Sequence, residues 1–149
     1  MKQFVGIKIK KLNENAKIPT RGTNGSAGYD LYACMDKDIV IESHKSVLVP
    51  TGLAMALPEG YYAAIVARSG LAIKQGLRLA NCYAVCDADY RGEYFIPLYN
   101  DSAVKRVIHS GYRVAQMLIK KYEICTFHCV DELDDTDRGA NGFGSTGIN

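Results

Sequence analysis

Short runs of apolar or alternating residues recur along the chain, and Gly, Pro, Asn and Asp separate them. The runs cover residues 5–9, 39–41, 47–49, 53–57, 61–67, 94–99, 114–119 and 124–130. Each run has the length of a β-strand, and many short strands between turn residues are typical of a β-sandwich or β-barrel. The pattern therefore predicts an all-β domain.

Only residues 70–75 have the features of a helix. Ser69 precedes them and could cap the N-terminus, and Gly76 follows them and could end the helix in a left-handed conformation. The helix would be a turn or two long and would follow the predicted strand 61–67 directly. Its positive N-terminal end would then lie at a strand end, where it could bind an anion.

Size and charge limit the possible partners. A chain of 149 residues is expected to form about one domain with a single core. A net charge of +2 is far from that of proteins that bind the nucleic-acid backbone, so we expect no direct nucleic-acid binding, although a local cluster could bind a small anion. No signal peptide or membrane-spanning run is visible. We therefore expect a cytoplasmic protein without membrane contact.

The cysteines favour reduced thiols without structural zinc. There are five, at Cys34, Cys82, Cys86, Cys125 and Cys129, which is an odd number without a secretory signal. Two pairs are four residues apart, but zinc sites usually space their ligands more tightly, so structural zinc is disfavoured. We expect the thiols to serve as small buried hydrophobic groups.

Two segments carry residue types that bind phosphate groups. In the first, Arg68 offers a fork of donors, Ser69 adds a hydroxyl, and Gly70 allows a ligand to approach the backbone. The second is Gln116, an amide inside an apolar strand, which needs a hydrogen-bond partner. Taken alone, the first segment also fits an ordinary helix start, and Gln116 also fits an amide bonded to nearby backbone.

Two carboxylates follow an apolar strand, at Asp87 and Asp89. In extended backbone they would face the same way and raise each other's pKa, which suits a general base, whereas a tight turn would remove that alternation. The spacing alone fits a hairpin turn with solvated carboxylates better.

The last residues, 134–149, have no apolar period and are rich in glycine. Glycine-rich turns can bind anions through backbone amides, Arg138 adds charge, and Phe143 offers a flat face for a nucleobase. The segment therefore fits a flexible lid over a nucleotide as well as a frayed terminus.

Taken together and in order, five segments resemble the motifs of the trimeric dUTPase family (deoxyuridine triphosphate nucleotidohydrolases). They are Ser26-Ala-Gly-Tyr-Asp-Leu-Tyr32, Arg68-Ser-Gly-Leu71, Asp87-Ala-Asp-Tyr-Arg-Gly92, Gly111-Tyr-Arg-Val-Ala-Gln116 and Arg138-Gly-Ala-Asn-Gly-Phe-Gly-Ser-Thr-Gly147. The resemblance implies a jelly-roll β-barrel over residues 1–133, with one short helix, and a flexible C-terminal lid over residues 134–149. It also implies a homotrimer whose active sites are shared between chains.

The activity implied by this resemblance is hydrolysis of dUTP to dUMP and pyrophosphate, which supplies dUMP for thymidylate synthesis and keeps uracil out of DNA. Asp87 matches the base that activates water for attack on the α-phosphorus, and Tyr90 matches the ring that packs against deoxyribose and excludes a 2′-hydroxyl. Asn81 and the backbone of Val85, Cys86 and Asp87 match the part of the family's hairpin that binds uracil.

The remaining roles concern the phosphates and the metal. Side chains and backbone that match the family's phosphate contacts are Arg68, Ser69, Gly70 and Gln116 near the scissile bond and Arg138, Gly144, Ser145 and Thr146 in the tail. Phe143 matches the ring that covers uracil. The cofactor implied is Mg²⁺ carried mainly by triphosphate oxygens, with Asp30 contacting its water shell.

Two residues depart from the family pattern, and two alternatives remain. Ala84 stands where the family usually has glycine, and Cys86 stands where it usually has isoleucine, so affinity for uracil or exclusion of thymine could shift. The alternatives are a dCTP deaminase-like enzyme, for which we find no base-activating residues beside Arg68 and Ser69, and a non-catalytic regulatory protein that responds to dUTP. Asp87, Tyr90 and the tail argue against loss of catalysis.

Overall fold

The computed structural model describes residues 4–142, and the chain forms twelve β-strands and one α-helix there. The elements are β1 (Lys8–Lys11), β2 (Thr20–Arg21), β3 (Tyr29–Tyr32), β4 (Ile39–Ile41), β5 (Ser46–Pro50), β6 (Leu53–Ala56), β7 (Tyr61–Val66), α1 (Ser69–Gln75), β8 (Leu77–Leu79), β9 (Tyr83–Cys86), β10 (Phe95–Asn100), β11 (Arg106–Ile108) and β12 (Arg113–Lys121). The predicted all-β class with one short helix is confirmed.

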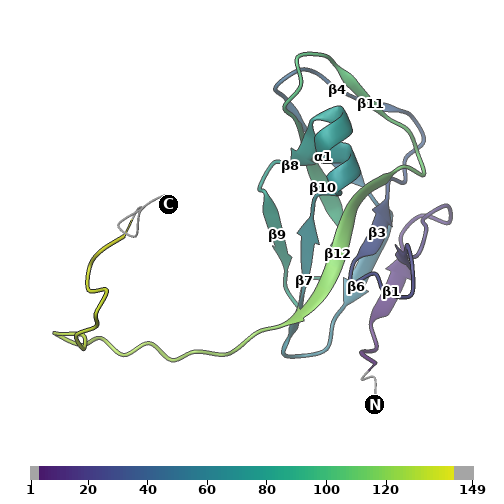
Figure 1. Cartoon of the computed structure of the whole chain (residues 1–149). Coiled ribbons are helices and arrows are strands. Elements are labelled where there is room, and N and C mark those ends of the chain that lie inside the picture. The colour runs from purple at the N-terminus through teal and green to yellow at the C-terminus, as the bar shows by residue number, and fades with distance from the viewer. Residues whose placement is uncertain (1–3, 143–149) are drawn as a thin grey trace.

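The strands form four antiparallel sheets (Figure 1). The largest has the order β2-β3-β12-β7-β9, and a second has the order β5-β10-β8. The pairs β1-β6 and β4-β11 complete the arrangement. Every strand pair is antiparallel, and most pairs join strands that are not consecutive in the chain.

One apolar core joins the sheets. The large sheet contributes Leu31, Ile65 and Met117, and the three-stranded sheet contributes Ile96 and Leu98, all of them buried. The alternation of side chains along β10 explains the burial of Ile96 and Leu98, which face inward while Phe95 is exposed. The packed interior thus holds the large sheet in place, together with the strand ends where the motif residues lie.

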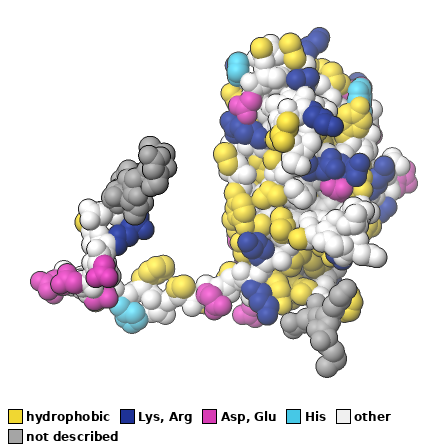
Figure 2. Space-filling model, in the orientation of Figure 1, with side chains coloured by type: hydrophobic (Ala, Val, Ile, Leu, Met, Phe, Trp, Pro, Cys, Tyr) yellow, Lys and Arg dark blue, Asp and Glu magenta, His cyan; other side chains and the backbone are white. Residues whose placement is uncertain are grey.

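The prediction of a strand over residues 124–130 is wrong. The last strand, β12, ends at Lys121, and the following residues leave the barrel as extended chain (Figure 1). Ile124, Phe127 and Leu133 are 82%, 93% and 85% exposed. The apolar pattern is present, but within residues 4–142 this segment pairs with no other strand, and a strand needs partners for its backbone groups. Figure 2 shows acidic side chains gathered along the same tail.

The helix α1 begins one residue earlier than its predicted cap implies. Arg68 occupies the N-cap position with extended backbone, and Ser69 is already helical, so the predicted cap by the Ser69 side chain is wrong. Gly76 ends the helix at a φ of 64°, as predicted, and its N–H donates to the carbonyl oxygen of Ala72. Leu71 is buried and holds α1 against the core.

The cysteines are all free, as predicted, but only Cys34 is buried. Cys86 is half-buried, and Cys82, Cys125 and Cys129 are exposed, so the expectation of buried thiols is wrong for these three. Residues 4–142 contain no group of three or more His, Cys, Asp or Glu side chains that could hold a metal ion. Within the same residues, no helix is long and apolar enough to cross a membrane.

Candidate active site

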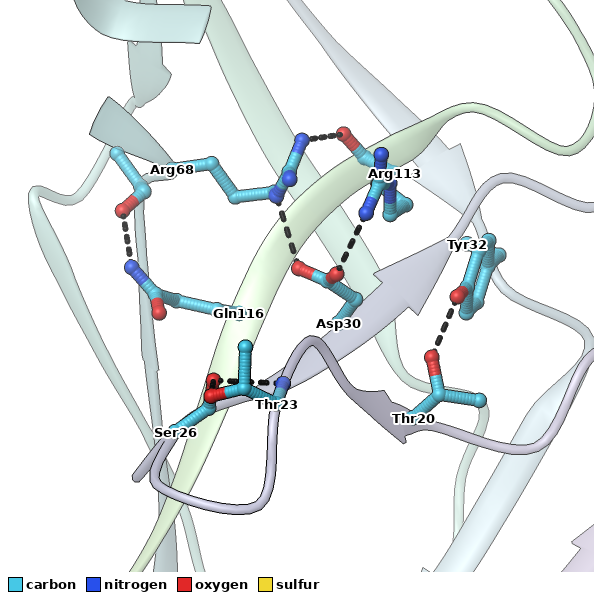
Figure 3. A network of polar contacts seen from close by, with 9 residues as sticks. Thr20, Thr23, Ser26, Asp30, Tyr32, Arg68, Arg113 and Gln116 are labelled. Carbon is cyan, nitrogen blue, oxygen red and sulfur yellow. Dashed lines mark hydrogen bonds and ion pairs between the residues drawn. The ribbon is translucent and has the colours of Figure 1, made fainter. Parts of the chain in front are cut away.

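The first, second and fourth motifs meet around one carboxylate, that of Asp30 (Figure 3). Arg68 donates from Nε to Asp30 Oδ1 at 2.8 Å, and Arg113 donates from a guanidinium nitrogen to Oδ2 at 3.3 Å. The Asp30 side chain is only 13% exposed, so its charge needs these partners. One carboxylate between two guanidinium groups leaves a net positive charge, which suits an anionic ligand.

Gln116 joins the same cluster from β12. Its Nε2 donates to the carbonyl oxygen of Ala67 at 3.1 Å, next to Arg68 (Figure 3). Gln116 lies in register with Asp30 on one side and with Val66 on the other. The structure therefore brings Arg68, Arg113, Gln116 and Asp30 together, and Ser69 follows Arg68 directly in the chain. We call these five residues the phosphate set. A Cβ on Gly70 would meet nothing within 4 Å among the described residues, so local packing does not require glycine there.

The position of the Gln116 amide depends on Gly28. A Cβ at residue 28 would lie 2.5 Å from Gln116 Oε1. We expect Gly28→Ala to displace this amide and to lower kcat/KM about tenfold, with little change in melting temperature because the end of the side chain can move. Steady-state kinetics and thermal unfolding test this. Gly25→Ala is the matched control, since its Cβ would meet only Thr23 Oγ1 at 3.9 Å, and an equal loss in both variants would contradict the prediction.

The third motif lies at the edge of the large sheet. The outermost strand is β9, so its alternate backbone groups point away from β7 without a strand partner in the described part of the chain. The side chains of Tyr83 and Val85 are exposed on β9, and those of Ala84 and Cys86 are half-buried against the core. This edge offers backbone donors and acceptors to a flat polar ligand. Asn81 lies just before it, next to Cys82 with its positive φ of 61°.

A tight turn follows β9, so Asp87 and Asp89 do not keep the alternation of extended backbone. The N–H of Tyr90 donates to the carbonyl oxygen of Asp87 at 3.2 Å and closes the turn. The Tyr90 hydroxyl donates to the carbonyl oxygen of Glu93 at 3.0 Å. A Cβ on Gly92 would overlap the Tyr90 ring and hydroxyl, so glycine there allows the ring its position. Asp87 and Tyr90 thus lie on one ordered turn.

Asp87 lines an open hollow of about 710 Å³, large enough for a small-molecule ligand. Its other walls include Tyr62, Val85, Asp89, Arg91 and Tyr122. Sequence reasoning missed Tyr62 and Tyr122, whose rings lie 6.5 Å apart. Tyr62 lies at the start of β7 and Tyr122 just after β12, and the antiparallel pairing of these two strands, invisible in the sequence pattern, brings them together.

Burial controls the thiol beside the turn. Burial, and to a smaller extent the charge of Asp87, raise the pKa of Cys86 above its usual value. A thiol with a raised pKa stays protonated at neutral pH and is a poor nucleophile. Cys86 therefore acts as an apolar support behind Asp87.

The two halves of the site lie at opposite ends of β7. Cys86 is opposite Ala63 in the β7–β9 register, so Asp87 lies near the start of β7. Arg68 follows the far end of β7, about 16 Å along the strand from Ala63. Within one chain, Asp87 and the phosphate set are therefore separated along the large sheet.

The tail residues lie apart from both halves. Arg138 Nε donates to the carbonyl oxygen of Asn141 at 2.9 Å, and Figure 1 shows this part of the chain away from the barrel. The other predicted tail residues, Phe143, Gly144, Ser145 and Thr146, lie outside the described residues.

Comparisons with known proteins agree with the motifs. Residues 14–147 match the family model of the dUTPases. The deoxyuridine 5'-triphosphate nucleotidohydrolase of Orientia tsutsugamushi (strain Boryong) is 44% identical over 145 residues, 95% of this chain and 98% of that protein. The protein with the same name from Rickettsia felis is 46% identical over 143 residues, 95% of this chain and 97% of that protein.

Solved structures of phage enzymes share the fold. The dUTPase of Staphylococcus bacteriophage 80alpha, solved with dUpNHpp, superposes with a TM-score of 0.87 at 26% identity and covers 96% of this chain and 99% of that chain. The phage phi11 dUTPase of S. aureus, in a mutant described with a structural Mg(II) ion, gives a TM-score of 0.79 at 23% identity over 87% of this chain and 99% of that chain. The predicted jelly-roll barrel is thereby confirmed.

Proposed function

Because this chain belongs to the dUTPase family, we propose that it hydrolyses dUTP to dUMP and pyrophosphate. The observation that carries the proposal is the match over residues 14–147, which contains all five motifs. It favours dUTP hydrolysis over a dCTP deaminase or a regulatory protein without catalysis. The phage enzymes are also described as controlling the transfer of virulence genes, which is a statement about those proteins alone.

The chemical step is assigned to Asp87. Its carboxylate accepts a proton from water, and the water oxygen attacks the α-phosphorus as the bond from that phosphorus to the bridging oxygen of the β-phosphate breaks. Pyrophosphate leaves with the electron pair of the broken bond. The support for this role is the place of Asp87 on an ordered turn beside an open hollow.

Base and sugar are selected next to Asp87. The unpaired backbone edge of β9 bonds to the polar edge of uracil, with Asn81 beside it. The Tyr90 ring, fixed by its hydroxyl bond to Glu93 and by the space at Gly92, packs against deoxyribose and excludes a 2′-hydroxyl.

The phosphate set neutralises and orients the triphosphate. Arg68 and Arg113 carry the charge, Ser69 and Gln116 add polar groups, and Asp30 holds both guanidinium groups in place. Asp30 contacts the arginines through both of its oxygens, so its predicted contact with the metal's water shell is an additional role that we retain as a proposal.

The residues present fit Mg²⁺ that arrives with the nucleotide. Residues 4–142 hold no cage of metal-ligating side chains, and Mg²⁺ is commonly bound by substrate phosphates, waters and at most one or two carboxylates. When bound, the ion would withdraw charge from the triphosphate. Asp30, beside Arg68 and Arg113, is the residue that would contact its water shell.

The separation of the two halves supports a homotrimer with shared sites. A complete site forms when Asp87 of one chain faces the phosphate set of another. The exposed apolar residues Ile124, Phe127 and Leu133 give each chain a segment that can pack on a neighbour. The lid of residues 134–149 then closes with Arg138, Phe143, Gly144, Ser145 and Thr146 over the bound nucleotide.

A nucleotide panel tests the function. The purified chain is incubated with each deoxynucleoside triphosphate and with UTP, with Mg²⁺ or with a chelator, and pyrophosphate and ammonia are measured. We expect pyrophosphate from dUTP and a sharp loss in chelator. Ammonia from dCTP would support the deaminase instead, and tight dUTP binding without turnover would support a regulatory protein.

A further inference from the structure

Tyr94 lies beneath the turn that carries Asp87 and has a fixed backbone. Its N–H donates to the carbonyl oxygen of Leu53 at 2.8 Å, and its carbonyl oxygen accepts from Thr51 Oγ1 at 2.7 Å. The side chain is only 1% exposed. Its ring lies 5.9 Å from the ring of Tyr90 at an interplanar angle of 40°. Tyr94 is therefore a rigid support under the catalytic turn.

The hydroxyl of Tyr94 is unusual because it is buried and has no hydrogen-bond partner within residues 4–142. A buried unpaired hydroxyl costs free energy, and phenylalanine would fill nearly the same space without that cost. The aromatic ring accounts for the packing of Tyr94 in the core. Packing alone gives no reason for a hydroxyl group at this position.

The hydroxyl is kept in a form that can donate. Burial raises the pKa of Tyr94 strongly, the neighbouring ionisable groups of Cys86, Tyr90 and Asp87 raise it further, and Arg91 lowers it. These four residues belong to the end of β9 and the turn after it. The Tyr94 ring lies 5.9 Å from the ring of Tyr90, whose N–H closes the turn onto the Asp87 carbonyl oxygen, so the hydroxyl belongs to a side chain that packs against this turn.

We propose that Tyr94 is a positioning residue whose hydroxyl donates a hydrogen bond to the Asp87 turn when nucleotide is bound, directly or through one buried water. The bond holds the Asp87 carboxylate in line with the attacking water. Such bonds are often long or absent in a free enzyme and form in the substrate complex. This inference rests on the proposed dUTP hydrolysis and adds a residue outside all five motifs.

The test compares Tyr94→Phe with the wild-type protein and with Tyr99→Phe. Tyr99 lies on β10, opposite Ser46 of β5 and Arg78 of β8, and its ring centroid is 4.6 Å from the Arg78 guanidinium. It therefore controls for the loss of a tyrosine hydroxyl in another sheet. The measurements are the single-turnover rate, kcat, KM for dUTP and the melting temperature. We expect Tyr94→Phe to lower kcat and the single-turnover rate about tenfold, with KM within about twofold and an equal or higher melting temperature.

Each other outcome would overturn the inference. An unchanged kcat would show that the hydroxyl has no part in the reaction. A rise in KM alone would make it a binding group, and a lower melting temperature would mean that it already has a stabilising partner in the free protein. If the wild-type protein fails to hydrolyse dUTP, the proposed function fails first, and that result is distinct from a change in the variant.

Discussion

The Asp87→Asn variant is expected to bind dUTP but to hydrolyse it about a thousandfold more slowly than the wild-type protein. Asparagine keeps the shape of the side chain and its place on the turn, but its amide does not accept a proton from water. The loss should therefore appear in kcat, while the dissociation constant of a non-hydrolysable dUTP analogue stays within about threefold. Pyrophosphate release and calorimetric titration measure the two quantities.

Asp89→Asn is the matched control for this prediction. It makes the same chemical change two positions away in the same turn, beside the same hollow. We expect a loss below about tenfold, since the second carboxylate shapes the local charge without taking the proton. Equal losses in the two variants would contradict the assignment of the base to Asp87 alone.

Mixing two inactive variants should restore activity. If Asp87 and Arg68 serve one site from different chains, a trimer that contains both Asp87→Asn and Arg68→Ala chains has some sites with both residues intact. When equal amounts of the two variants reassociate at random, about a quarter of the sites have both residues intact. We therefore expect the mixture, co-refolded or co-expressed with two affinity tags, to regain about a quarter of wild-type activity, far above either variant alone.

A second mixture controls for unspecific rescue. Arg68 and Gln116 meet at Ala67 within one chain, so the Arg68→Ala and Gln116→Ala variants damage the same phosphate set. Their mixture should stay as inactive as its parents. Recovery in both mixtures, recovery in neither, or a stable monomer in light scattering would each contradict a site shared in this way.

Local patterns predicted strands where the residues form an uninterrupted apolar run. The predicted strand 39–41 coincides with β4, and 61–67 overruns β7 by one residue. The short strands β2, β3, β8 and β11 were missed, because a charged residue interrupts the apolar pattern in each of them. The segment 124–130 has an apolar pattern typical of a strand. A strand also needs a partner for its backbone groups, and the described part of the chain offers none to this segment.

Residues of the first, second and fourth motifs lie together in the structure, but the sequence does not indicate the contacts between them. The contact between Arg113 and Asp30 spans 83 positions, and no local pattern indicates it. The roles of Tyr62 and Tyr122 depend on strand register in the same way. Even the helix cap was misassigned, because Arg68 continues the extended backbone of β7 and so takes the position that Ser69 was expected to hold.

The edge position of β9 has a consequence for how the protein can change over time. If uracil is recognised by main-chain amides and carbonyls, selectivity is a property of the path of the backbone, which side-chain replacements largely preserve. Ala84 and Cys86 can then differ from the family's usual residues while the chemical pattern offered to the base stays the same. Proline, which has no amide hydrogen, is the replacement that would delete part of that pattern. Mutational tolerance along β9 is thus a direct outcome of recognition without side chains.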